Sequence, residues 1–153
     1  MRIPGMSSVS LLQLIGELGH DSVEKFDTPA KFCKWCNLVP NNKISGGKLI
    51  SSRVSKRKNP VGQVFRLCAN TLKDAKNSLG IYFRRIRSRS GHMQAIIATA
   101  HKMARIFYTM VKNKSEYDET NVGIDEQELL LKKIERAKIT LARLNAKLCV
   151  SAI

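Results

Sequence analysis

Apolar residues in the middle of this 153-residue chain recur at the three- and four-residue spacing of a buried helix face. The first run holds Val64, Cys68, Leu72, Ala75, Leu79, Phe83 and Ile86. A second run, after Gly91, holds Ile96, Ala100, Met103, Ala104, Phe107, Tyr108 and Val111. We therefore expect two long helices that are joined at Gly91 and pair antiparallel, as part of an all-α fold.

Two shorter helices are predicted before this pair. Val9, Leu12, Ile15 and Leu18 follow Ser7 and Ser8, either of which could cap a helix that carries them on its apolar face. Thr28 and Pro29 then mark the start of a helix whose buried side would hold Phe32, Trp35, Cys36 and Leu38. For Trp35 we favour this core position over stacking on an unpaired base.

The end of the chain predicts a linker and one more helix. Residues 116–123 are polar and acidic, whereas Leu130, Ile134, Ala137, Leu141, Leu144 and Leu148 form an apolar stripe. We divide the chain into a domain over residues 1–115, a linker over residues 116–123 and a C-terminal amphipathic helix over residues 124–153. The stripe could dock on the same chain or pair as a coiled coil, and the sequence does not choose between the two.

Charge is segregated along the chain, whose formal net charge is +15. Residues 40–115 contain 17 Lys and Arg and a single acid, Asp74, while the remainder has 10 basic and 11 acidic residues. Such a balance indicates a polyanionic partner, with nucleic acid first. A membrane is the rival, but no stretch has the apolar length of a membrane-spanning helix, so we expect a cytoplasmic, nucleoid-associated protein without a membrane partner.

The cysteines suggest packing rather than metal binding. Cys33 and Cys36 have the spacing of half a zinc site, but no second ligand pair accompanies them, and His20, His92 and His101 are isolated. We expect no metal site in this chain. For His101 we favour a capping or core-polar role over catalysis.

Two segments have residues that could contact a phosphate group. Gly5 and Ser7, in a turn before the first helix, resemble a helix-hairpin-helix turn whose backbone amides contact phosphate, although a plain αα-hairpin is the alternative. Residues 41–60 are glycine-rich, serine-rich and basic, and they predict a basic loop or a small hairpin. Within it, Ser45 is followed by Gly46, Gly47 and Lys48, so its hydroxyl could closely approach a phosphodiester.

The order of several motifs carries a resemblance to a family. P-G-M-S-S, L-V-P, S-G-G-K, S-K-R-K-N, Y-F-R-R, T-A-H-K-M-A-R and Y-D follow one another from Pro4 to Asp118. In this order the chain resembles the C-terminal half of the IS110-type insertion-sequence transposases, a group that includes the IS116 and IS902 types. It departs from the family pattern at Ser7, Asn37 and Lys58, where the family usually has glycine.

The resemblance implies a function. Ser45 would be the nucleophile that attacks a DNA phosphate in transposition, with Ser51, Ser52 and Ser55 as alternatives. Mg²⁺ would be held by carboxylates of an N-terminal RuvC-like half that this sequence does not contain, so we expect the chain alone to be inactive. Family membership would also imply a guide RNA and a homo-oligomer. The competing interpretations are a non-catalytic nucleic-acid-binding remnant or regulator, and a structural helical module.

The residues expected to contact DNA or RNA follow from the charge pattern and the resemblance together. They are Gly5, Ser7, Gly46, Gly47, Lys48, Arg53, Lys56, Arg57, Lys58, Arg84, Arg85, Arg87 and Arg89.

Overall fold

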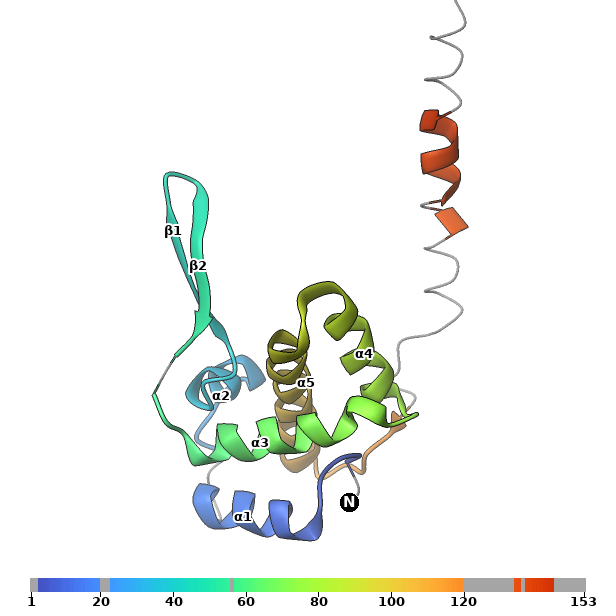
Figure 1. The fold of residues 1–153 in the computed structure, drawn as a ribbon. Helices are drawn as coiled ribbons and strands as arrows, with labels where there is room; N and C mark the ends of the chain where they lie inside the picture. Colours follow the sequence, from blue (N-terminus) through green and yellow to red (C-terminus); the bar gives the residue numbers. More distant parts are fainter. Residues whose placement is uncertain (1–2, 20–22, 56, 120–133, 136, 145–153) are drawn as a thin grey trace, which may run out of the picture. The chain divides into compact units, whose positions relative to one another are not determined.

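The structure is a computed structural model that describes residues 3–19, 23–55, 57–119, 134–135 and 137–144 (Figure 1). The chain divides into two units, Met1–Val122 and Gly123–Ile153. The first unit begins with helices α1 (Ser8–Leu18) and α2 (Pro29–Trp35), followed by strands β1 (Pro40–Ser45) and β2 (Lys48–Val54). It continues with α3 (Pro60–Thr71), the 3-10 turn η1 (Leu72–Asp74), α4 (Ser78–Ser90) and α5 (His92–Asn113).

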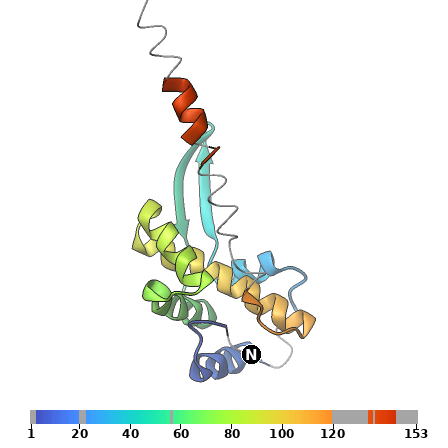
Figure 2. The same ribbon diagram turned by 90° about the vertical axis from the view of Figure 1, so that its right-hand side faces the viewer.

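The fold is mostly helical, as predicted, but it is not purely α, because β1 and β2 pair as an antiparallel hairpin. This hairpin occupies the segment for which the sequence allowed either a basic loop or a small hairpin. It extends away from the helices in both views (Figures 1 and 2), and nearly all of its residues are exposed. The hairpin therefore adds no layer to the core.

Side-chain caps determine where the helices begin. Ser7, Thr28, Asn59 and Asn77 each accept a hydrogen bond from the backbone N–H three residues later, at 3.1, 3.3, 2.9 and 2.8 Å. Proline occupies the first turn of α2 and of α3, where its missing N–H costs nothing. These caps confirm two predicted helix starts, at Ser7 and Thr28.

The first of the two long helices is broken, contrary to the sequence prediction. α3 ends at Thr71, Ala75 is extended with a ψ of 141°, and Asn77 caps the new helix α4. The apolar spacing runs through this break, but the Asn77 side chain offers Gly80 N–H a local hydrogen bond that starts a separate helix. The prediction of a helix pair joined at Gly91 holds for α4 and α5, which pack on each other.

The core lies around α5, against which α2, α3 and α4 all pack. Three phenylalanines lie at its centre. Phe32, Phe65 and Phe107 form edge-to-face and stacked pairs with ring centroids 5.7 to 6.4 Å apart. The two predicted apolar stripes supply most of the remaining core, and their exceptions are the half-buried Ala75 and Ile96 and the exposed Val111.

Helix α1 buries only Leu18 of its four predicted apolar residues and adds Leu14. Val9, Leu12 and Ile15 are 74%, 69% and 51% exposed, whereas Leu14 and Leu18 are buried. Both series have helical spacing, and the packing of α1 on α3 selects the second. Trp35 is also less buried than predicted: the residue is 44% exposed, and its ring covers the edge of the core by packing on Phe26 and Phe32.

The start of the predicted linker belongs to the first unit and packs on its helices. Tyr117 is half-buried against the core, and a Glu119 carboxylate oxygen accepts a hydrogen bond of 2.9 Å from Ser78 N–H at the start of α4. In the second unit, the described residues 134–135 and 137–144 are helical and expose Ile134, Ile139, Leu141 and Leu144. The rest of the predicted C-terminal helix lies outside the described residues. Over the described part of the chain, no helix has the length and apolar character needed to cross a membrane.

Candidate nucleic-acid interface

The tip of the hairpin is a two-residue glycine turn. Gly46 and Gly47 have φ values of 55° and 73°, in the left-handed region that glycine adopts without a steric penalty. Two successive positive φ values are typical of the tight turn whose twist matches that of the strands it joins. Ser45 and Lys48 are paired directly across this turn, and both are exposed.

The pairing register sorts the hairpin into two faces. Residues that are paired across a ladder share a face, and so do alternate residues along a strand. A cationic face therefore carries Asn41, Lys43, Ser45, Lys48, Ser51 and Arg53. The opposite face carries Ile44 and Leu49 at the tip, and a β-bulge between the Lys43 and Ile44 pairs adds Ile50.

The four candidate serines differ in what they contact. Ser52 Oγ donates a hydrogen bond of 2.7 Å to Asn42 Oδ1, and Ser55 Oγ accepts one of 3.2 Å from Arg57 N–H. Ser51 is half-buried in β2. Ser45 is exposed at the tip, and within the described part of the chain no side chain bonds to its hydroxyl. Ser45 is thus the candidate best placed for an incoming ligand.

A hydrogen-bonded clamp holds the base of the hairpin to the helices. Asn37 Nδ2 donates to the Arg57 carbonyl at 2.9 Å, and Arg66 Nη2 donates to the Asn37 carbonyl at 2.6 Å. Asn59, which caps α3, also donates from Nδ2 to the Trp35 carbonyl at 2.9 Å. Asn37 has a φ of 56°, which accounts for the glycine that the family usually has at this position.

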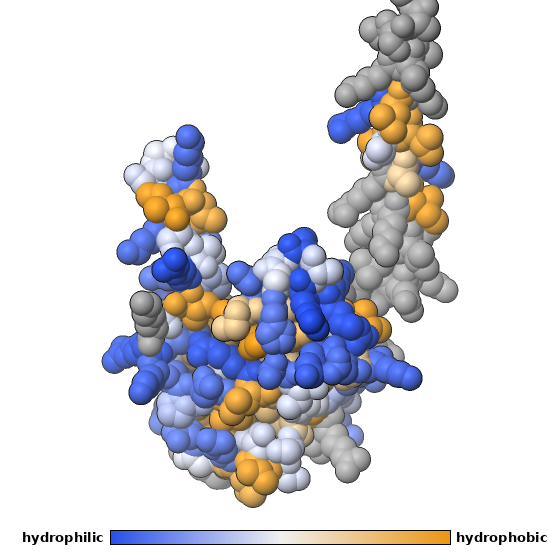
Figure 3. All heavy atoms as spheres, in the orientation of Figure 1, coloured by the Kyte–Doolittle hydropathy of each residue, from blue (hydrophilic) through white to orange (hydrophobic). Residues whose placement is uncertain are grey.

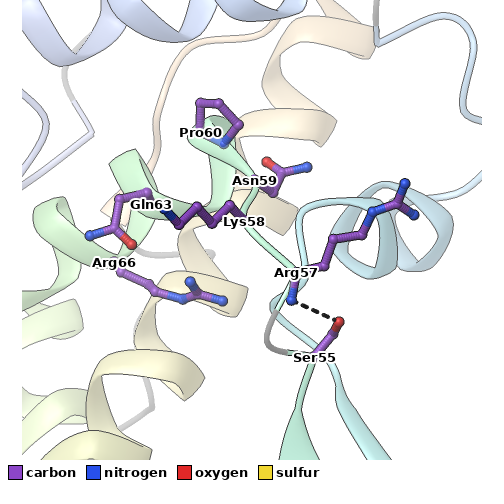
Figure 4. Close-up of a pocket in the computed structure, with 7 residues that line it drawn as sticks. All are labelled: Ser55, Arg57, Lys58, Asn59, Pro60, Gln63 and Arg66. Carbon is purple, nitrogen blue, oxygen red and sulfur yellow. Dashed lines mark hydrogen bonds between the residues drawn. The ribbon is translucent and has the colours of Figure 1, made fainter.

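An open basic pocket of about 450 Å³ lies beside this clamp (Figure 4). Its lining residues are Ser55, Arg57, Lys58, Asn59, Pro60, Gln63 and Arg66. Three of them are cationic and none is acidic, so the pocket suits an anionic ligand such as a phosphate group of a nucleic acid. The predicted contact residues Arg57 and Lys58 are therefore brought together with Arg66, while Lys56 lies outside the described residues.

Of the four predicted arginines of α4, Arg87 is exposed, and the other three fall into two groups. Arg84 Nη1 donates to the Ala75 carbonyl at 2.6 Å, so it helps to hold the break between η1 and α4. Arg85 and Arg89 are four residues apart, on one side of the helix, and Arg85 lies over the Tyr82 ring at 5.6 Å. Lys102 Nζ approaches the same ring at 4.7 Å, and burial together with Arg85 lowers its pKa.

Gly5 and Ser7 lie at the turn before α1, but both already have structural roles. A Cβ on Gly5 would lie 2.8 Å from Leu72 Cγ and 2.9 Å from the Cys68 carbonyl oxygen, so the turn packs closely on the end of α3. Ser7 is the cap of α1. Close packing and capping account for these residues without a phosphate, and a phosphate-binding role for them stays a prediction.

Cys33 and Cys36 lie in the core, as their packing interpretation predicted. Burial raises the pKa of the Cys33 thiol to about 11 and also raises that of Cys36, so both thiols stay protonated. Within the residues that the structure describes, no three His, Cys, Asp or Glu side chains lie close enough to hold a metal ion. His101 is half-buried on α5, and burial followed by Arg105 lowers its pKa.

Lys43 and Arg66 join the candidate interface although neither is among the contact residues predicted from the sequence. A strand interpretation of residues 41–60 would have found Lys43, because it alternates with Ser45. Arg66 follows the lining residue Gln63 by about one turn of α3, and its guanidinium also donates to the Asn37 carbonyl. Figure 3 shows hydrophilic side chains gathered in a band across the helices and along the hairpin, with apolar side chains near the hairpin tip.

An exposed cationic hairpin above a basic pocket defines a surface suited to a polyanion. Residues 1–80 match the profile of the family described as Transposase IS116/IS110/IS902 family. The match covers more than half of the chain, which therefore belongs to this family of transposases. It includes the hairpin and the pocket but ends before the α4 arginines. A search of curated proteins found no match, and neither did a search of solved structures.

Proposed function

We propose that this chain binds the DNA of an insertion element and supplies Ser45 as the nucleophile of strand transfer. Family membership supports DNA transposition in general. The observation that favours Ser45 in particular is its exposed place beside the glycine turn and opposite Lys48, where no side chain of the described residues bonds to its hydroxyl. A glycine turn without side chains allows a phosphodiester to approach the hydroxyl closely.

The proposed step balances without a further reactant. Ser45 Oγ attacks the phosphorus, an Oγ–P bond forms, and the bond from phosphorus to one sugar oxygen breaks. The serine proton ends on the departing sugar oxygen, which leaves a hydroxyl end and a phosphoserine diester. Lys48 and Lys43, which share the face of Ser45, would stabilise the charge that develops on the phosphate oxygens.

The surroundings of Ser45 do not fit Mg²⁺. Residues 40–73 contain no Asp or Glu, and the hairpin offers hydroxyl, amide and amine groups where Mg²⁺ prefers carboxylates and phosphate oxygens. The proposal therefore assigns any Mg²⁺ to a separate RuvC-like half, as the family resemblance implies.

The basic pocket and the α4 arginines would hold the nucleic acid. Arg57, Lys58 and Arg66 surround a pocket with no acid in its lining, and phosphate contacts of this kind position a duplex without reading its sequence. Arg85 and Arg89 lie on a different element, so a second strand or a guide RNA could be bound there. A homo-oligomer would bring more than one such surface to the DNA.

The test combines the 153-residue chain with a RuvC-like half from a family member, Mg²⁺, guide RNA and duplexes that carry the element ends. Denaturing gels and peptide mass spectrometry would then locate any protein–DNA adduct. We expect the adduct on Ser45, its loss in Ser45→Ala, and its survival in Ser51→Ala and Ser52→Ala. An adduct that survives Ser45→Ala overturns the assignment. Binding without any adduct would leave the chain a non-catalytic nucleic-acid-binding protein.

A further inference from the structure

Resting on the proposed DNA binding, we propose that Ile44, Leu49 and Ile50 at the hairpin tip form a base-contacting surface that enters the major groove of duplex DNA. These three residues are named the apolar tip. This assigns a second kind of contact to the hairpin, because its other face carries the cations and Ser45.

The first argument is the exposure of the apolar tip. The side chains of Ile44, Leu49 and Ile50 are 67%, 58% and 68% exposed, on a hairpin whose residues contribute nothing to the buried core. A two-stranded hairpin is marginally stable by itself in water. Large apolar side chains at its tip gain free energy only when a ligand removes them from water.

The second argument is the charge of the hairpin, which indicates an anionic ligand. Lys43, Lys48 and Arg53 cover the opposite face, and no acid occurs between residues 40 and 73. A ligand that meets cations on one side of a thin ribbon and apolar side chains on the other must offer anions and apolar groups within a few ångströms. DNA does so, because phosphates line its grooves and the methyl groups of thymine project into the major groove.

Shape selects duplex DNA over RNA. The major groove of B-form DNA admits a two-stranded β-ribbon, whereas that of A-form RNA is too deep and narrow for side chains to read. Gly46 and Gly47 carry no side chains and keep the leading end of the ribbon narrow. β1, of 6 residues, extends over about 20 Å, enough to reach across the groove.

The consequence concerns the position of Ser45. Ile44 and Ser45 are adjacent in β1 and point to opposite faces, so a base contact by Ile44 would determine which phosphate lies near the Ser45 hydroxyl. The apolar tip would therefore influence both the affinity and the choice of the phosphate attacked.

The first experiment measures the affinity of the full chain for a fluorescent duplex over a range of salt concentrations. Replacing the apolar tip by threonine (I44T, L49T, I50T) preserves β propensity, and we expect an affinity loss of about tenfold or more with an unchanged salt dependence. Replacing Lys43, Lys48 and Arg53 by glutamine should instead reduce the slope of log K against log salt by up to about 3. The control V9S, L12S, I15S removes three equally exposed apolar side chains from α1 and should leave both quantities unchanged.

The second experiment places 5-bromodeoxyuridine in the duplex, because its bromine occupies the position of the thymine methyl group in the major groove. Ultraviolet crosslinks should map to residues 44–50 and disappear in the threonine variant. The proposed base contact is wrong if the wild-type chain binds the duplex normally but the crosslinks lie elsewhere. It is also wrong if the threonine variant keeps full affinity, and in both cases the proposed DNA binding still holds. A threonine variant that loses as much affinity for the same sequence as duplex RNA as it does for duplex DNA also overturns the base contact. Absence of duplex binding by the wild-type chain contradicts the proposed function itself.

Discussion

Asn37 Nδ2 donates a hydrogen bond of 2.9 Å to the carbonyl of Arg57, which joins the end of α2 to the chain that returns from the hairpin. The carbonyl of Asn37 also accepts a hydrogen bond from Arg66, and the backbone of Asn37 has a φ of 56°. Asn37, just after α2, is thus hydrogen-bonded both to the base of the hairpin and to Arg66 of the basic pocket. Its replacement tests how much the interface depends on this clamp.

We expect Asn37→Gly and Asn37→Ala to separate the bond from the backbone geometry. Both variants lose the side-chain bond, but only alanine adds the strain of a left-handed backbone, about 1 kcal/mol. Chemical denaturation should therefore show Asn37→Ala to be the less stable of the two by that amount. Equal stabilities would mean that the backbone at residue 37 relaxes out of the left-handed region.

Gly62→Ala should be strongly destabilising. A Cβ at this position would lie 1.9 Å from the carbonyl oxygen of Cys36, which is backbone and cannot rotate away. We expect the free energy of unfolding to fall by about 2 kcal/mol or more. Gly16→Ala is the matched control, because the space around Gly16 in α1 is open and alanine favours a helix by about 0.5 to 1 kcal/mol. A neutral Gly62→Ala would show that α2 and α3 are farther apart than described.

His101 should make the protein sensitive to mild acid. Burial and Arg105 lower its pKa from the usual 6.5, so below that pH the unfolded chain takes up a proton that the folded chain resists. Stability is therefore unaffected above pH 6.5 and falls as the pH drops from there to the folded-state pKa. Thermal unfolding of His101→Gln should show a shallower loss over this range than the wild type. An identical profile would assign the acid sensitivity to other groups.

Arg57→Gln and Lys58→Gln test the basic pocket as a phosphate site. If each side chain contacts one phosphate, each substitution should reduce the slope of log K against log salt by about 0.9. Fluorescence anisotropy with a duplex provides both the affinity and the slope. Lys25→Gln removes an exposed charge away from the pocket and should leave the slope unchanged. A wild-type slope in the two pocket variants would exclude their direct contact with phosphate.

Local features of the sequence predicted much of the helical structure. Periodic apolar residues placed most of the buried faces of α3, α4 and α5, and Ser7 and Thr28 marked two helix starts, because caps and helical spacing act within a few residues of each other. The charge excess of residues 40–115 indicated a polyanionic partner without any structure. The S-G-G-K motif suggested Ser45 only together with the order of the other motifs.

Tertiary structure decided which side chains are buried and which share a face, where the spacing of residues in the sequence allowed more than one answer. Leu14 joins the predicted Leu18 in the buried face of α1 and Val9, Leu12 and Ile15 stay exposed, because packing on α3 selects between two apolar series that both have helical spacing. The pairing of Lys43, Ser45 and Lys48 on one hairpin face depends on a strand register that bonds between distant residues set. The sequence by itself thus determined which segments form helices and where the charge lies, while contacts between distant segments decided which side chains share a surface.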